Sequence, residues 1–276
     1  MARGARSALL GAGVCLAGLV VTGLLSAFSH TVRVRDAQGL SGFSAVQGHG
    51  LDDLMTRIVH FADPTPYLLF SLAVGLYAWM SGRHRTALVL GGLVVLAPLT
   101  TELLKHGLAH DRPGGIITSV RIGAASWPSG HTTGAATLAL AATLAAPARS
   151  RPLVAAIGLL FSLAVGYCVV ALVWHYPSDV LGALFVSGLW AFAAVAVLAR
   201  WPDPVPPATA QPGDAIGVGV LAVGVSAGLV LLAAHEGPHR LLSHVHGQTT
   251  AAIIAVVLGV VGALLAAGFA AAARRV

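Results

Sequence analysis

The sequence predicts an all-α protein, a polytopic membrane helix bundle with about eight transmembrane helices, and three observations lead to that fold class. Of the 276 residues, 57% are hydrophobic and only 9% are charged, whereas a soluble domain carries about 25% charged residues. The apolar residues form long runs, and arginines stand in short clusters between these runs. Backbone inside a bilayer must satisfy its own hydrogen bonds, so each run is expected to form a helix.

Eight apolar stretches predict the spans, in order: residues 8–28, 66–81, 86–104, 131–147, 153–174, 178–199, 214–234 and 250–272. Most approach the ~20 residues needed to cross ~30 Å of hydrocarbon, whereas the second and the fourth stretches are short. The first stretch could instead be a signal peptide cleaved near Ala27–Ser29, but its length favours a retained membrane anchor.

Residues 29–65 form the longest polar stretch and lie between the first two spans. An amphipathic helix on the outer surface is predicted around residues 51–61, because apolar residues recur there at helical spacing. The residues on that face are Leu51, Leu54, Ile58 and Phe61.

The six spans within residues 1–200 are expected to form the core that carries the functional motifs. Residues 201–213 are predicted to be a proline-rich cytoplasmic linker, since five prolines fall between Trp201 and Asp214. Residues 214–276 then form an appended hairpin of two transmembrane helices.

If the spans alternate in direction, nine arginines fall on one side of the membrane. That side is expected to be cytoplasmic, because short cytoplasmic loops are rich in Lys and Arg, and both termini of this multi-pass cell-membrane protein then lie there. The net charge of +6 does not indicate a nucleic-acid partner, since the arginines are confined to short clusters between apolar runs. The nine are Arg3, Arg6, Arg83, Arg85, Arg149, Arg151, Arg200, Arg274 and Arg275.

Three polar clusters fall at the predicted outer ends of the spans. The first cluster, Lys105–Pro113, places Lys105 and Arg112 two helical turns apart, and two cations so placed can clamp the oxygens of a phosphate. An alternative is that both side chains only reach toward lipid headgroups.

The second cluster, Pro128–His131, opens the fourth span. Gly130 lets the backbone approach a ligand closely, and the first amides and the dipole of the helix favour an anion. His131 is then placed to donate a proton to a leaving oxygen. An alternative is an ordinary loop-to-helix entry that Ser129 caps.

The third cluster, His175–Asp179, joins the fifth and sixth spans. Asp179 lies one turn after His175 and could hold one imidazole nitrogen, which leaves the other nitrogen as a nucleophile. An alternative is that the pair only caps the sixth span. Because all three clusters lie on the same side, together they suit phosphoryl transfer through a histidine nucleophile.

These clusters resemble the motifs of the type-2 phosphatidic acid phosphatase family, which shares its core with the vanadium haloperoxidases. The first two motifs are complete, and the second half of the third, Ser-Arg-x5-His-x3-Asp, is present as His175–Asp179. The resemblance covers residues 66–199. It implies that His175 attacks phosphorus, that Asp179 orients it and that His131 protonates the leaving group. It also implies a phosphohistidine intermediate, no metal, no cofactor, and phosphate binding by Lys105, Arg112, Ser129 and Gly130.

The sequence departs from the family pattern at one place, where Cys168 and Val169 stand for the Ser-Arg pair. A phosphate-binding cation is therefore missing, and losing one charged donor in a dry site lowers the rate by roughly 10²–10³-fold. Arg121 is the nearest candidate to replace it, and Arg240 is a second.

Other polar residues in the outer layer are not expected to bind metal. His106, His110 and Asp111 crowd the first cluster, but their spacing fits no specific ligand pattern. Glu102, one turn before His106, is expected either to be functional or to pair with Lys105 or His106.

The function expected from the sequence is that of an integral membrane hydrolase, a lipid-phosphate or lipid-diphosphate phosphatase that acts on the extracytoplasmic side. Its substrate would be undecaprenyl or another polyprenyl diphosphate, phosphatidic acid, or phosphatidylglycerol phosphate. A phosphotransferase of the same architecture is a close variant, and a haloperoxidase role is disfavoured by the membrane setting. The alternative is a degenerate, non-catalytic member that binds or helps transport phosphorylated lipids, which Val169 supports.

Overall fold

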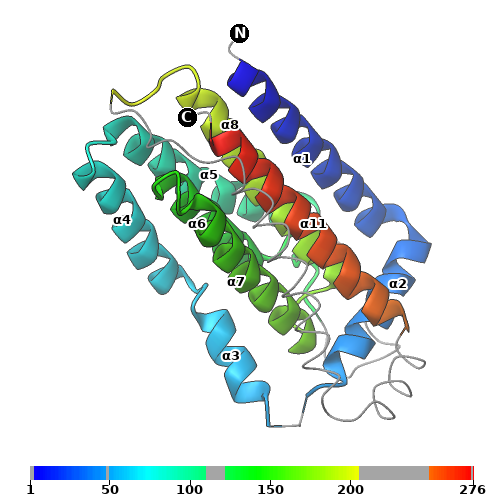
Figure 1. Cartoon of the computed structure of the whole chain (residues 1–276). Coiled ribbons are helices and arrows are strands. Elements are labelled where there is room, and N and C mark those ends of the chain that lie inside the picture. The colour runs from blue at the N-terminus through cyan, green and yellow to red at the C-terminus, as the bar shows by residue number, and fades with distance from the viewer. Residues whose placement is uncertain (1–2, 48–49, 110–121, 205–248, 275) are drawn as a thin grey trace.

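The structure is a computed structural model that describes residues 3–47, 50–109, 122–204, 249–274 and 276. Within these ranges the regular elements are α-helices, packed side by side in one bundle (Figure 1). The helices are α1 (Arg3–Phe28), α2 (His30–Ser44), α3 (Asp52–His60), α4 (Pro64–Met80), α5 (His84–Gly107), α6 (Gly130–Ala145), α7 (Arg151–Ala171), α8 (Pro177–Leu198) and α11 (Thr249–Ala273).

The predicted spans correspond closely to these helices wherever the structure describes them. Five helices, α1, α5, α7, α8 and α11, are long and apolar enough to cross a membrane. The second and fourth predicted spans are α4 and α6, with 17 and 16 residues, and both are as short as the sequence indicates. The predicted span 214–234 lies outside the described residues, so the count of eight spans stays a prediction.

Helix α2 is an element that the sequence pattern does not predict. It follows α1 directly, and the hydroxyl of Ser29 accepts a hydrogen bond from the amide of Val32 (3.4 Å) at its N-terminus. Its buried residues are few and include an acid, Asp36, along with Leu40. Helix α2 packs against α11 and α7, so tertiary contacts stabilise a segment whose own composition is polar.

Helix α3 confirms the predicted amphipathic helix, and the structure shows which way each face points. Met55 and Val59 are buried and belong to a hydrophobic cluster with residues of α7. The same apolar face continues beyond these two residues, where Leu51, Leu54 and Phe61 are exposed by 46%, 55% and 55%. An apolar face that is buried along one edge and exposed along the other suits a position between the protein core and lipid.

Helix α8 forms the centre of the bundle. It packs against α1, α5, α6 and α11, and most of its residues are buried. Helices α1, α5 and α11 instead keep large apolar side chains exposed, among them Leu10, Leu103 and Leu264. This arrangement is expected when lipid, not water, surrounds the outer helices.

The loops that carry the predicted cytoplasmic arginines meet at one end of the bundle. Arg83 donates to the carbonyl of Ala145 (2.6 Å), and Arg151 donates to the carbonyl of Ala273. Asp203 accepts from the amide of Arg85 (2.8 Å). Helix α1 begins and α11 ends at this same end, opposite α2 and α3 (Figure 1).

Candidate active site

The other end of the bundle brings the three clusters together. Lys105 lies in the last turn of α5, His131 in the first turn of α6, and His175 in the turn between α7 and α8. The Lys105 ammonium approaches Gly130 so closely that a Cβ at that glycine would lie 3.1 Å from Nζ. His131 interacts electrostatically with both His175 and Lys105. The clusters therefore share one site.

The third cluster forms the hydrogen-bonded pair that its spacing predicts. Nδ1 of His175 lies 3.2 Å from Oδ2 of Asp179, and the same oxygen accepts from the amide of Tyr176 (3.1 Å). Asp179 is fully buried, whereas the side chain of His175 is 12% exposed. The carboxylate is thus fixed from two directions, and Nε2 is the ring nitrogen that Asp179 does not hold.

A strained turn places His175. The amides of Val173 and Trp174 donate to the carbonyls of Val170 and Val169 (3.0 and 2.9 Å), which is the Schellman pattern of a helix end. Val173 occupies the left-handed position of that pattern with φ of +62°, where glycine is usual. A β-branched residue there costs about 1–3 kcal/mol, so surrounding packing must maintain the turn.

The second cluster is tied to the third through backbone. The Ser129 hydroxyl accepts from the amide of Thr132 (3.3 Å) and caps α6, as the alternative interpretation of this cluster expects. The Ser129 amide donates to the carbonyl of Asp179 (3.0 Å). That amide is therefore already engaged, which leaves the amides after it, beginning with Gly130, to face an anion.

Trp127, immediately before the second cluster, locks it against two helices. The indole is 3% exposed, and its Nε1 donates to the carbonyl of Ser178 (3.1 Å). It fits between glycines, since a Cβ at Gly23 of α1 or at Gly182 of α8 would lie 2.8 or 2.7 Å from it. Sequence analysis did not single out Trp127, because nothing local marks which glycines face it.

Asp36 of α2 caps the helix that carries Asp179. Its carboxylate accepts from the amide of Ser178 (3.0 Å) and from the Ser178 hydroxyl (2.5 Å), and Asp36 is only 5% exposed. An acid at a helix N-terminus satisfies free amides and complements the dipole. The sequence offered no signal for this contact beyond an acid in a polar segment.

The first cluster is described only in part. Lys105 Nζ lies 2.7 Å from Oε1 of Glu102, which is one of the pairings that the sequence leaves open for this glutamate. His106 lies beside the backbone carbonyl of Glu102 (2.8 Å). Arg112 falls outside the described residues, and so do both proposed replacement cations, Arg121 and Arg240.

Val169, at the position of the family's arginine, lies in an apolar environment. Its side chain is fully buried in a hydrophobic cluster that includes Val59, Ala135 and Val165. Among the described residues packed around Val169, no basic side chain takes the place of the arginine in phosphate binding. Cys168 beside it is buried as a free thiol.

Asp63, in the turn between α3 and α4, is a contact residue that sequence analysis missed. Its Oδ1 lies 3.1 Å from Nε2 of His131, and its Oδ2 lies 2.7 Å from Nδ1 of His60. The Trp174 ring stands beside both imidazoles, with centroids 5.6 Å from His131 and 6.4 Å from His60. In the sequence, Asp63 is only an acid before Pro64, a pattern that indicates the start of a helix and not a contact with His131.

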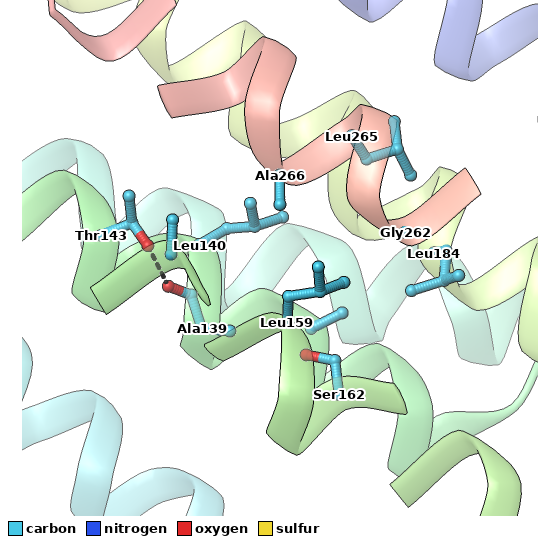
Figure 2. Close-up of a pocket in the computed structure, with 11 residues that line it drawn as sticks. Ala139, Leu140, Thr143, Leu159, Ser162, Leu184, Gly262, Leu265 and Ala266 are labelled. Atoms are coloured by element: carbon cyan, nitrogen blue, oxygen red, sulfur yellow. Dashed lines mark hydrogen bonds between the residues drawn. The ribbon is translucent and has the colours of Figure 1, made fainter. Parts of the chain in front are cut away.

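Within the described ranges, no three His, Cys, Asp or Glu side chains are grouped so that they could hold a metal ion. A separate pocket lies between α6, α7, α8 and α11 (Figure 2). Its hydroxyls are bonded within their own helices, Thr143 to Ala139 (2.8 Å) and Ser162 to Gly158 (2.7 Å). The pocket is apolar and contains none of the clustered residues.

Comparison with known proteins finds one family and one solved structure that this chain resembles. Residues 86–203 match the model of the PAP2 superfamily. The structure is similar to that of a transmembrane PAP2 type phosphatidylglycerolphosphate phosphatase from Bacillus subtilis, with a TM-score of 0.59 and 19% identity over 71% of this chain and 98% of that one. No curated protein matches the chain. Residues 86–203, which hold all three clusters, therefore resemble the PAP2 superfamily.

Proposed function

We propose that the protein is an integral membrane phosphatase that hydrolyses a lipid phosphate or a lipid diphosphate through a histidine nucleophile. The match of residues 86–203 to the PAP2 superfamily supports phosphatase activity, and five long apolar helices support the membrane location. The observation that carries the proposal is the meeting of Lys105, His131 and the His175–Asp179 pair at one end of the bundle.

In the first half of the reaction, Nε2 of His175 attacks phosphorus while Asp179 holds the proton on Nδ1. The bond from phosphorus to the lipid oxygen breaks, and that oxygen takes a proton from His131. Asp179 keeps the imidazole in the tautomer that has a lone pair on Nε2 and stabilises the charge that develops on the ring. The products are a phosphohistidine and the lipid alcohol, or the lipid monophosphate when the substrate is a diphosphate.

In the second half, a water molecule attacks the phosphohistidine and gives its proton to His131. The nitrogen–phosphorus bond breaks, and inorganic phosphate leaves. Lys105, Arg112 and the backbone that starts α6, with Ser129 and Gly130, hold the phosphate oxygens throughout. Their charges and dipoles are fixed before the reaction begins, which is the main source of stabilisation in phosphoryl transfer.

The ion pair between Glu102 and Lys105 bears on phosphate binding. Glu102 is 55% exposed and Lys105 only 18%, so the carboxylate can swing into solvent while the ammonium stays at the site. A phosphate dianion then replaces Glu102 as the partner of Lys105. Because the ion pair between Glu102 and Lys105 must break first, the free energy of phosphate binding is less favourable by the energy of that pair. This energy is about 1 kcal/mol or less for a pair exposed on one side.

The surroundings of the site suit a lipid rather than a soluble phosphate. The exposed apolar face of α3 with Leu51, Leu54 and Phe61 lies on the same end of the bundle, as does Trp174, 38% exposed. Such residues lie where the headgroup region meets the acyl chains. A lipid would keep its tail against them while its phosphate reaches His175, on the extracytoplasmic side that the arginine distribution favours. Polyprenyl diphosphates, phosphatidic acid and phosphatidylglycerol phosphate all fit this description.

A second candidate function is phosphate-lipid binding without turnover. The apolar environment of Val169 favours it, because a site built for fast phosphoryl transfer gains from each added cation. The intact His–Asp pair favours catalysis instead, since binding alone requires neither a nucleophile nor a residue to orient it.

Phosphate release from purified protein tests the proposal. The full chain in detergent is supplied with undecaprenyl diphosphate, phosphatidic acid and phosphatidylglycerol phosphate, and inorganic phosphate is measured. We expect release from at least one lipid, and a drop of roughly 10³-fold or more in His175→Ala. His84→Ala, the same change at an exposed position at the opposite end, should act as wild type. Equal release by His175→Ala, or no release from any lipid, contradicts the proposal.

A further inference from the structure

We propose that Asp63 is a positioning residue for His131, so that the active site holds two His–Asp pairs rather than one. The inference rests on the proposed phosphatase function and adds a residue that lies outside the matched family segment, residues 86–203. Asp179 holds the nucleophile, His175, and Asp63 holds the proton donor, His131.

The first observation is that the Asp63 carboxylate is turned away from its own helix. Asp63 is the N-cap residue of α4, where an acid normally accepts from the second or third amide of the helix, yet it makes no such bond. Pro66 occupies the third helical position and has no N–H to donate. Both carboxylate oxygens instead face imidazoles, Oδ1 toward His131 (3.1 Å) and Oδ2 toward His60 (2.7 Å).

The second observation is the charge around His131. The ring lies near the ammonium of Lys105, and that charge opposes a positive charge on it. A general acid in this reaction must carry an extra proton when the substrate arrives. Asp63 hydrogen-bonds to Nε2 of that ring and supplies the negative charge that stabilises its protonated form.

The hydrogen bond also determines which nitrogen takes part in the reaction. With Nε2–H donated to Asp63, the Nδ1–H of the protonated ring goes to the leaving oxygen as the phosphorus–oxygen bond breaks. The neutral ring that results keeps its proton on Nε2 and has a lone pair on Nδ1. That lone pair accepts a proton from the water that attacks the phosphohistidine, which restores the protonated ring.

His60 and Trp174 hold Asp63 and His131 in this arrangement. His60 is bonded to the second carboxylate oxygen, and the Trp174 ring lies beside both imidazoles. Trp174 directly precedes the nucleophile, so the two His–Asp pairs are connected through one aromatic side chain. The turn between α3 and α4 thereby belongs to the site.

The test compares two substrates that differ in their need for an acid. p-Nitrophenyl phosphate expels a stable phenolate, whereas dioctanoyl phosphatidic acid expels an alkoxide that must be protonated. The measured quantity is kcat/KM, because it reports only the steps up to departure of the leaving group. In the full-length Asp63→Asn variant we expect kcat/KM to fall about 10²-fold or more for the phosphatidic acid and far less for p-nitrophenyl phosphate.

Two further variants complete the design. Asp53→Asn makes the same change at an exposed position of α3 and should leave both substrates unaffected. Asp63→Glu keeps the charge and should recover part of the lost activity toward phosphatidic acid, and it gives the same comparison if Asp63→Asn fails to fold. An equal loss on both substrates, or no loss, overturns the inference. Wild-type protein that cleaves neither substrate rejects the proposed function instead.

Discussion

The backbone amide of Ser129 donates a hydrogen bond to the carbonyl of Asp179, at 3.0 Å. This single bond joins the start of α6 to the first turn of α8, so the second and third clusters cannot move independently. Trp127 and Asp36 strengthen the same junction, because the Trp127 indole donates to the carbonyl of Ser178 and Asp36 accepts from its amide. The geometry of the site therefore depends on residues that never touch the phosphate.

Enlarging Gly182 should disturb the site from a distance. A methyl group there would lie within 2.7 Å of the Trp127 indole, and overpacking of this kind costs about 1–3 kcal/mol. We expect Gly182→Ala to lower the thermal unfolding temperature and to reduce phosphate release. Gly91→Ala in α5, where nothing lies within 4 Å of the added atom, is the matched control and should do neither.

Removing the Asp36 carboxylate should affect both stability and activity. Asp36→Ala leaves the amide and hydroxyl of buried Ser178 without this partner, at a cost of about 1–3 kcal/mol. Asp203→Ala removes an equivalent cap from α5 at the opposite end of the bundle. The thermal unfolding temperature should fall in both variants, while kcat should fall only in Asp36→Ala. If Asp36→Ala and Asp203→Ala had the same kcat, Asp36 would have no role in the geometry of the active site.

Introducing an arginine at position 169, where the motif of the similar family has one, should not raise phosphate release. Val169→Arg places an unpaired cation among buried apolar side chains, which costs several kcal/mol. We expect the variant to unfold at a markedly lower temperature or not to fold, with no gain in phosphate release. Val169→Leu serves as the control for added volume. A stable and more active arginine variant would mean that the residues packed around Val169 accommodate a cation after all.

Neutralising Glu102 should tighten substrate binding. Glu102→Gln removes the ion-pair partner of Lys105, and we expect KM for a lipid phosphate to fall by a few-fold, as an exposed pair of about 1 kcal/mol or less allows. Lys105→Gln should raise KM and lower kcat. Measuring kcat and KM of both variants with phosphatidic acid tests these two expectations. An unchanged KM in Glu102→Gln would mean that the glutamate does not affect phosphate binding.

Cysteine labelling tests the orientation in the membrane. Single cysteines replace Asp53 in α3 and Ser81 at the end of α4, both exposed, while the native Cys15 and Cys168 are buried. A membrane-impermeant maleimide added to whole cells should label Asp53→Cys and spare Ser81→Cys until the cells are opened. The reverse pattern would place the active site in the cytoplasm.

Sequence reasoning identified the membrane helices and the three clusters because each depends on local information. A run of apolar residues predicts a span whatever surrounds it, and His175 and Asp179 are only four positions apart across the start of α8. The missed features all depend on contacts between segments far apart in the chain. Asp36 and Asp63 are acids in a polar stretch, and only packing shows that each binds a motif-bearing helix.

The turn before His175 could not be predicted for a different reason. A valine in the left-handed region contradicts its own preference, so no sequence rule would place it there. The apolar environment of Val169 was likewise a question that the sequence raised and could not answer. The sequence shows that residue 169 is a valine, but only the fold shows that the side chains around it are apolar.

Direct detection of the intermediate tests the central claim, that His131 and His175 act on one phosphate. In His131→Ala the base that completes hydrolysis is gone, while p-nitrophenyl phosphate can still transfer its phosphoryl group without an acid. Mass spectrometry of this variant, denatured at alkaline pH after reaction, should find a phosphoryl group on the imidazole of His175. Adding His175→Ala should abolish it. A phosphoryl group on another residue, or none in the presence of nitrophenolate release, would contradict the account.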